Sequence, residues 1–84
     1  MQVHVTPRFK QSRKRLSQAN VAAVDKALRL LEQNPWHPSL QTGKLNPKSK
    51  GIWYCRATKS IRIAFKWTTD IVTLLDVGPH DILN

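Results

Sequence analysis

The chain has 84 residues, and its 14 Lys and Arg against five Asp and Glu give a formal net charge of +9 at pH 7. This length suffices for a modest core, so we expect a single domain over residues 1–84. A hydrophobic fraction of 40% fits an ordinary globular domain better than a disordered chain. The charge attracts polyanions, which points to RNA, DNA or an acidic protein as partner.

The chain offers no feature of a secreted or membrane protein. Cys55 is the only cysteine, which excludes an intramolecular disulfide and favours a reducing compartment. Residues 1–16 lack the apolar stretch of a signal peptide. The longest apolar segment, residues 71–77, includes Asp76 and is too short to span a bilayer. We therefore expect a soluble, cytoplasmic protein.

The first elements in the chain are a strand and a basic helix. Alternation predicts a strand over residues 2–5. Thr6 and Pro7 form a helix start, because a hydroxyl can cap the helix and proline needs no N–H at the first position. The predicted helix over 7–16 offers Phe9 and Leu16 to the core. Its five basic residues, with no acid among them, are Arg8, Lys10, Arg13, Lys14 and Arg15. Because like charges at helical spacing repel, this density favours a compensating partner.

A second, amphipathic helix is predicted over residues 20–33, with Asn20 as its cap and Asn34-Pro35 as its stop signal. The short connection between the helices forces an antiparallel hairpin. An apolar stripe at helical spacing marks the face toward the core, and it consists of Val21, Val24, Ala27, Leu28, Leu30 and Leu31.

The second half of the chain is predicted to be β. After an irregular loop and a turn, β-rich runs follow one another to the end of the chain. The predicted loops are 35–43 and 46–51, and the predicted strands are 44–45, 52–58, 61–67 and 71–77. The order β-α-α-β-β-β-β predicts an α+β, two-layer fold, with the helical hairpin packed on one face of a mainly antiparallel sheet.

Alternation along the run 61–67 separates two faces. Ile61, Ile63, Phe65 and Trp67 lie on one face, so Arg62 lies on the other. Because the helices must cover the apolar face, Arg62 is predicted to point to the open side. Counted inward from the Lys59 turn, Arg56 points to the same side, provided that the register does not slip by one residue. Two arginines on an open face suit phosphate binding.

Several kinds of site are disfavoured. His4, His37, His80 and Cys55 lie on separate elements without paired metal-ligand spacing, so we expect no metal. The glycines are too far apart for a phosphate-binding loop, and we expect no cofactor. Cys55 lies in the middle of a strand and is interpreted as a packing residue.

The remaining candidates are basic, aromatic or able to transfer a proton. His80 follows a strand end and can exchange a proton near neutrality, although a surface histidine is the simpler interpretation. Trp67 is predicted in the core, whereas Trp36 and Trp53 are candidates to stack on bases. The candidate RNA-binding residues are Lys44, Lys48, Lys50, Lys59, Lys66, Trp53, Tyr54 and Asp81.

The combined pattern resembles the RelE/ParE toxin superfamily over nearly the whole chain, although no single motif is diagnostic. The matching residues are Phe9, Leu16, Leu28–Leu31, Asn34-Pro35, Lys44-Leu45, Gly51-Ile52-Trp53-Tyr54, Arg56, Ile61-Arg62-Ile63 and Val77-Gly78-Pro79-His80-Asp81.

The resemblance implies a RelE-like fold and a ribosome-dependent mRNA endonuclease that needs no metal. In such enzymes the ribose 2′-hydroxyl attacks its own phosphate. The resemblance implies that Arg62 stabilises phosphate charge, that His80 occupies a functional position, and that Arg56 is a second family arginine. It implies an acidic antitoxin, the ribosome and mRNA as partners, and a monomer when free of antitoxin.

The chain also departs from the family pattern. No lysine pair lies on the predicted strand 52–58 and no tyrosine follows His80, so Tyr54, Asp81 or Lys50 would have to complete the proton transfer. Two other functions stay open. A ParE-like inhibitor of DNA gyrase would use the helical hairpin and would not need His80. A plain RNA-binding module would carry stacked aromatics on the open face.

Overall fold

The computed structural model describes residues 1–44, 51–79 and 82, and it confirms the predicted order of elements. A short 3-10 helix, η1, is added within the predicted loop. The elements are β1 (Gln2–Val5), α1 (Pro7–Lys14), α2 (Gln18–Gln33), η1 (Pro38–Leu40), β2 (Gly43–Lys44), β3 (Ile52–Arg56), β4 (Arg62–Thr68) and β5 (Ile71–Gly78).

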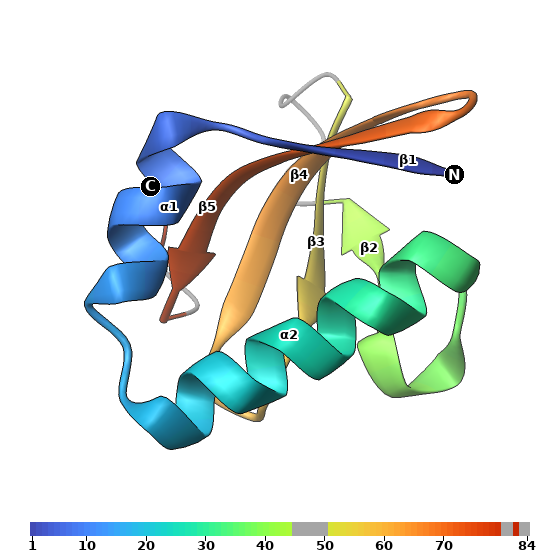
Figure 1. Cartoon of the computed structure of the whole chain (residues 1–84). Helices are drawn as coiled ribbons and strands as arrows, with labels where there is room; N and C mark the ends of the chain where they lie inside the picture. The colour runs from blue at the N-terminus through green and yellow to red at the C-terminus, as the bar shows by residue number, and fades with distance from the viewer. Residues whose placement is uncertain (45–50, 80–81, 83–84) are drawn as a thin grey trace.

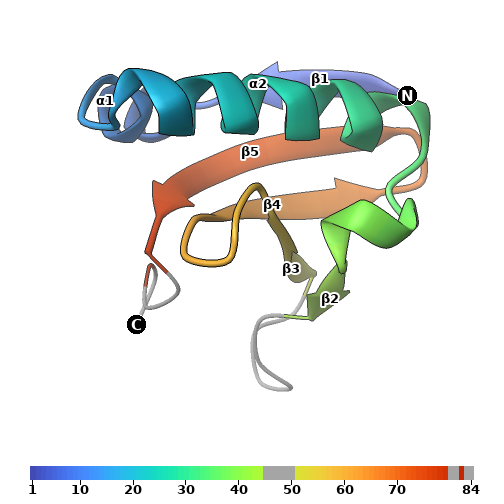
Figure 2. The same ribbon diagram turned by 90° about the horizontal axis from the view of Figure 1, so that it is seen from below.

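The strands form one five-stranded sheet in the order β1-β5-β4-β3-β2. Its pairs are antiparallel except for β1, which runs parallel to β5. Both helices lie on the same side of the sheet, with α2 running across the face and α1 beside β5 (Figures 1 and 2). The predicted two-layer arrangement on a mainly antiparallel sheet is therefore confirmed.

The helix starts depend on two hydroxyl caps. Thr6 Oγ1 accepts a hydrogen bond from the N–H of Phe9 at 3.2 Å, which confirms the first predicted cap. The second predicted cap is wrong, because α2 begins at Gln18 and Ser17 Oγ accepts from the N–H of Asn20. The prediction placed the cap three residues too late. None of the described helices is long and apolar enough to cross a membrane.

The core lies between α2 and the inner face of β4 and β5. Phe9, whose side chain is buried, adds α1 to this core, and Leu16 packs against it, as predicted. Val21 lies outside this cluster, so the buried stripe of α2 is narrower than predicted. The most buried members include Val24, Ala27 and Leu31 from α2, together with Ile63, Phe65, Val72 and Leu74 from the sheet.

The basic charge of α1 is partly compensated within the chain. The Arg13 guanidinium pairs with Asp25 of α2 at 2.8 Å, and that of Arg8 pairs with Asp76 of β5 at 3.1 Å. The charge compensation that the sequence favoured for this helix is thus supplied by Asp25 and Asp76 of the same chain. The other basic residues of the helix region, Lys10, Lys14 and Arg15, are exposed.

A β-bulge in β5 lies next to Asp76, whose side chain contacts α1. Phe65 is paired with Leu74, but Ala64 is paired with Asp76, so β5 has one extra residue at this point. The Asp76 side chain is buried, and its carboxylate accepts from the N–H of Val77 and the hydroxyl of Ser12, besides pairing with Arg8. Asp76 therefore holds the first helix against β5.

We predict that Asp76→Asn destabilises the fold by about 1–3 kcal/mol, since it removes the charge that Arg8 and Ser12 solvate in a buried position. Urea denaturation should show a lower midpoint with an unchanged slope. Asp70→Asn, in the exposed turn between β4 and β5, is the matched control and should stay within about 0.5 kcal/mol. Equal losses in both variants would contradict the role given to Asp76.

Candidate nucleic-acid interface

The hairpin of β3 and β4 places Arg56 directly opposite Arg62. Its turn fixes the register, because the N–H of Ala57 donates to the carbonyl of Ile61 at 2.9 Å. Within the turn, Thr58 Oγ1 accepts from the N–H groups of Ser60 and Ile61. The slip that would have separated the two arginines does not occur, and they lie on one face as predicted.

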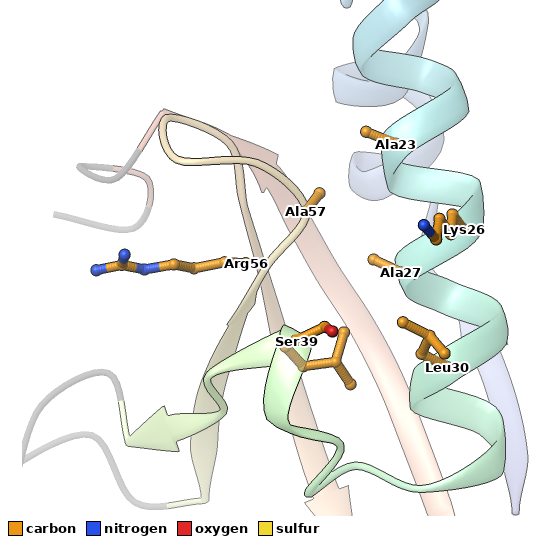
Figure 3. Close-up of a pocket in the computed structure, with 8 residues that line it drawn as sticks. Ala23, Lys26, Ala27, Leu30, Ser39, Arg56 and Ala57 are labelled. Atoms are coloured by element: carbon orange, nitrogen blue, oxygen red, sulfur yellow. The ribbon is translucent and has the colours of Figure 1, made fainter.

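This face is the one without helices. Figure 3 shows the Arg56 side chain extending away from α2, whereas Ala57 points toward the helix, where a small cavity lies between α2 and the hairpin. Because residues directly opposite on paired strands share a face, Arg62 also points to the open side. Its neighbours in sequence, Ile61 and Ile63, are buried. The predicted separation of the two faces is confirmed here.

The two guanidinium groups lack a counter-charge among the described residues. The Nε atoms of both are buried and have no hydrogen-bond partner in that part of the chain, where the ion pairs involve other side chains. Like charges opposite each other on neighbouring strands are destabilising, and an unsatisfied buried donor costs about 1–3 kcal/mol. A phosphate could supply both the acceptors and the charge, and the planar fork of arginine fits it well.

Tyr54 positions Arg62. The Arg62 guanidinium carbon lies 4.7 Å from the centroid of the Tyr54 ring, within the range of a cation–π contact. The same ring lies over Gly43 of β2, where an added Cβ would be 3.5 Å from the tyrosine oxygen. The Tyr54 ring thus packs over the edge strand at van der Waals distance, and it restricts where Arg62 can point.

The end of β5 completes the surroundings of Arg62. Gly78 is paired with Arg62, and an added Cβ at Gly78 would be 2.8 Å from the Ile82 side chain. The Ile82 side chain therefore lies close against Gly78, and a larger residue at Gly78 would require that side chain to shift. The candidates His80 and Asp81 fall between these residues in sequence and lie outside the described residues.

The other predicted RNA-binding residues divide between the two faces. Lys66 is exposed on β4, on the same face as Arg62, and Lys59 is exposed in the turn next to Arg56. Trp53 lies on the opposite face, packed against other tryptophans. Lys44 is paired with it, and its Nζ lies 5.7 Å from the Trp53 ring centroid. The predicted Lys48 and Lys50 fall outside the described segments.

Cys55 is a packing residue, as the sequence indicated. Its side chain is fully buried in the core. Burial raises the pKa of the Cys55 thiol to about 12, so the thiol stays protonated at neutral pH and is a poor nucleophile. Among residues 1–44, 51–79 and 82, no three His, Cys, Asp or Glu side chains gather to hold a metal.

Two features of this surface were missed by the sequence analysis. One is the ring of Tyr54 between Gly43 and Arg62, for which a glycine opposite an aromatic residue gives only a weak signal. The other is the anchoring role of Asp76. A carboxylate in an apolar strand was its signal, because buried acids are nearly always paired.

Comparisons with solved structures place the fold among the toxins of toxin–antitoxin systems. A YoeB/ParE toxin from Agrobacterium tumefaciens has a TM-score of 0.78 at 15% identity, covering 95% of this chain and 99% of its own. The archaeal RelE–RelB complex from Pyrococcus horikoshii gives 0.75 at 15% identity, covering 96% of each chain.

A toxin–antitoxin complex from Mycobacterium tuberculosis gives a TM-score of 0.77 at 18% identity and covers 93% of this chain and 95% of its own. No protein-family model and no curated protein matches the chain. At these identities the likeness shows the RelE-like fold, while the residues of the open face have to be argued from their own chemistry.

Proposed function

From the fold that this chain shares with RelE-like toxins, we propose that it is the toxin of a type II toxin–antitoxin system and cleaves mRNA on the ribosome. The observation that carries the proposal is the pair of arginines on the open face, whose buried Nε atoms have no partner among the described residues. Such a pair costs stability in the free protein, and a polyanion relieves that cost.

The proposed reaction is an internal transfer at one phosphodiester. The 2′-hydroxyl of the preceding ribose loses its proton and attacks phosphorus, so a P–O2′ bond forms. The P–O5′ bond breaks and the leaving oxygen takes a proton, which yields a 2′,3′-cyclic phosphate and a 5′-hydroxyl end. Negative charge grows on the phosphate oxygens in the transition state, and preorganised cationic donors stabilise that charge most effectively.

We assign this charge stabilisation to Arg62, with Arg56 as the second guanidinium. Arg62 is supported by its contact with the Tyr54 ring and by its place opposite Gly78. His80, two residues beyond Gly78 in sequence, is proposed as a proton-transfer group. Tyr54, Asp81 or Lys50 would serve as its counterpart.

The proposed partners are the ribosome with its mRNA and an acidic antitoxin. Lys59 and Lys66 extend the positive charge around the arginine pair, which suits the RNA backbone. The exposed Lys10, Lys14 and Arg15 lie outside the ion pairs of α1. We assign them to the antitoxin, because an acidic segment would neutralise the charge that Asp25 and Asp76 leave uncompensated.

Arg62→Ala should fold normally and lose about 10²- to 10³-fold in single-turnover cleavage of ribosome-bound mRNA, which is the typical loss on removing one transition-state donor. The side chain faces away from the core, so its removal leaves no cavity. Arg62→Lys should recover only part of the rate, because lysine keeps the charge but lacks the planar fork.

Arg29→Ala is the matched control, since Arg29 is exposed on α2, and it should leave the cleavage rate unchanged. A well-folded Arg62→Ala protein that cleaves at the parental rate would show that Arg62 is an ordinary surface residue, and the proposed nuclease would then lose its main support.

His80→Gln should lower the single-turnover rate by about 10²- to 10⁴-fold, the range of general acid–base catalysis. Binding to the ribosome should hardly change, because a neutral histidine adds little to phosphate attraction. The pH–rate profile of the parent should bend in the histidine range, and the bend should vanish in the variant. A lower melting temperature with an unchanged rate per folded molecule would instead identify a structural histidine.

A further inference from the structure

All three tryptophans of the chain lie in one cluster. Trp36 follows α2, Trp53 is on β3 and Trp67 is on β4. Their ring centroids are 5.6 Å apart for Trp36 and Trp53, 5.1 Å for Trp36 and Trp67, and 5.2 Å for Trp53 and Trp67. This tryptophan cluster belongs to the helix-covered side of the sheet, so the arginine pair does not use it.

The outermost ring, Trp36, is exposed but held in place. It is 58% exposed, the largest value among the exposed large apolar residues described. The backbone N–H of Trp36 donates to the side-chain oxygen of Asn34 at 3.0 Å, and the hydroxyl of Thr42 donates to the carbonyl of Pro35. These contacts close the loop after α2, so the indole is presented to solvent by an ordered segment.

The surface around the cluster combines an aromatic platform with hydrogen-bonding groups and a cation. An open hollow of about 500 Å³ is lined by the three tryptophans together with Thr68 and Thr69. The ammonium nitrogen of Lys44 lies 5.7 Å from the centroid of the Trp53 ring, one of the rings that line this hollow. Aromatic rings beside a cation are typical of sites for unpaired nucleotides, where the base stacks and the phosphate meets the charge.

The cluster lies far from the arginine pair. The turn that joins β4 to β5 and the turn that joins β3 to β4 lie at opposite ends of β4 (Figures 1 and 2). Arg62 begins this strand and Trp67 is its last residue but one, a separation of about 17 Å at the usual rise of a strand. One nucleotide cannot contact both places, so the cluster is a separate site.

We propose that the tryptophan cluster binds an unpaired nucleotide of single-stranded RNA. Its base stacks on Trp36 and its phosphate meets Lys44. The choice of RNA over DNA rests on the proposed function, while the stacking geometry stands on its own. A protein partner fits less well, because lysine is depleted at the centres of protein interfaces, whereas a net charge of +9 favours nucleic acid.

The test is a fluorescence titration of the full chain with a single-stranded 2′-O-methyl RNA tetranucleotide, which lacks the hydroxyl needed for cleavage. Tryptophan emission reports on the cluster alone, because the chain has no other tryptophan. We expect saturable quenching by this RNA, weak or no quenching by the same backbone without bases, and weaker binding of the DNA tetranucleotide of equal sequence.

Calorimetry on variants should assign the effect. Trp36→Ala should weaken binding of the RNA tetranucleotide by roughly 5- to 150-fold, the usual loss on removing one stacking ring. Trp36→Phe should retain most of the affinity. Val5→Ala removes another exposed apolar side chain and should change nothing. Arg62→Ala should keep the quenching, so a failure of the proposed nuclease would not affect this result.

Three outcomes would overturn the proposal. Equal quenching by the abasic backbone would exclude base stacking. Unchanged affinity in well-folded Trp36→Ala and Trp36→Phe proteins would mean that the cluster only packs the edge of the core. Equal binding of DNA and RNA would overturn the assignment to RNA.

Discussion

Leu75 is the extra residue of the β5 bulge, and the positions of the functional side chains depend on it. In a regular strand without the bulge, Leu75 would lie opposite Ala64, and continued alternation from the Phe65–Leu74 pair would place Asp76 opposite Ile63 in the core and Val77 opposite Arg62 on the open face. With it, Val77 is buried opposite Ile63 and Gly78 lies opposite Arg62. A single inserted residue can thus re-aim every side chain that follows it along a strand.

The same bulge keeps the charged side chain of Asp76 from pointing into the apolar core. Asp76 points away from Ile63 and Phe65 and reaches the α1 side chains of Arg8 and Ser12, so the buried carboxylate is satisfied and the first helix is fixed to β5. On the other side of Arg62, Tyr54 packs over Gly43. Arg62 therefore lies between the Tyr54 ring on β3 and Gly78 on β5, a restricted position for a flexible side chain.

The arginine pair on the open face lowers the stability of the folded protein. Two like charges face each other across the hairpin with buried Nε atoms that lack partners among the described residues. A core formed by the opposite face, including Ile63 and Phe65, offsets the cost. Local destabilisation of this kind is typical of binding sites, where a ligand supplies the missing interactions.

Much of this arrangement followed from the sequence, because alternation and turn position fix which face a strand residue occupies. That reasoning placed Arg56 and Arg62 together on the open side. The same alternation places Trp53 and Tyr54 of β3 on opposite faces of the sheet. The prediction that both bind RNA did not take this into account. Ser17 was missed as a cap because Asn20 is an equally good capping residue.

The bulge could not be predicted, because Leu74 and Leu75 are both apolar and either could have faced the core. The contacts within the tryptophan cluster could not be predicted from the sequence either. They join a loop to two strands, and only the tertiary fold brings these segments together.

The central claim is that the open face bearing Arg56 and Arg62 cleaves mRNA, and mapping the 5′ ends of messages after induced expression tests it most directly. The account predicts new ends within translated codons that carry 5′-hydroxyl groups and are absent when Arg62→Ala is expressed at the same level. Intact messages in cells that still stop growing, with DNA gyrase arrested, would contradict it.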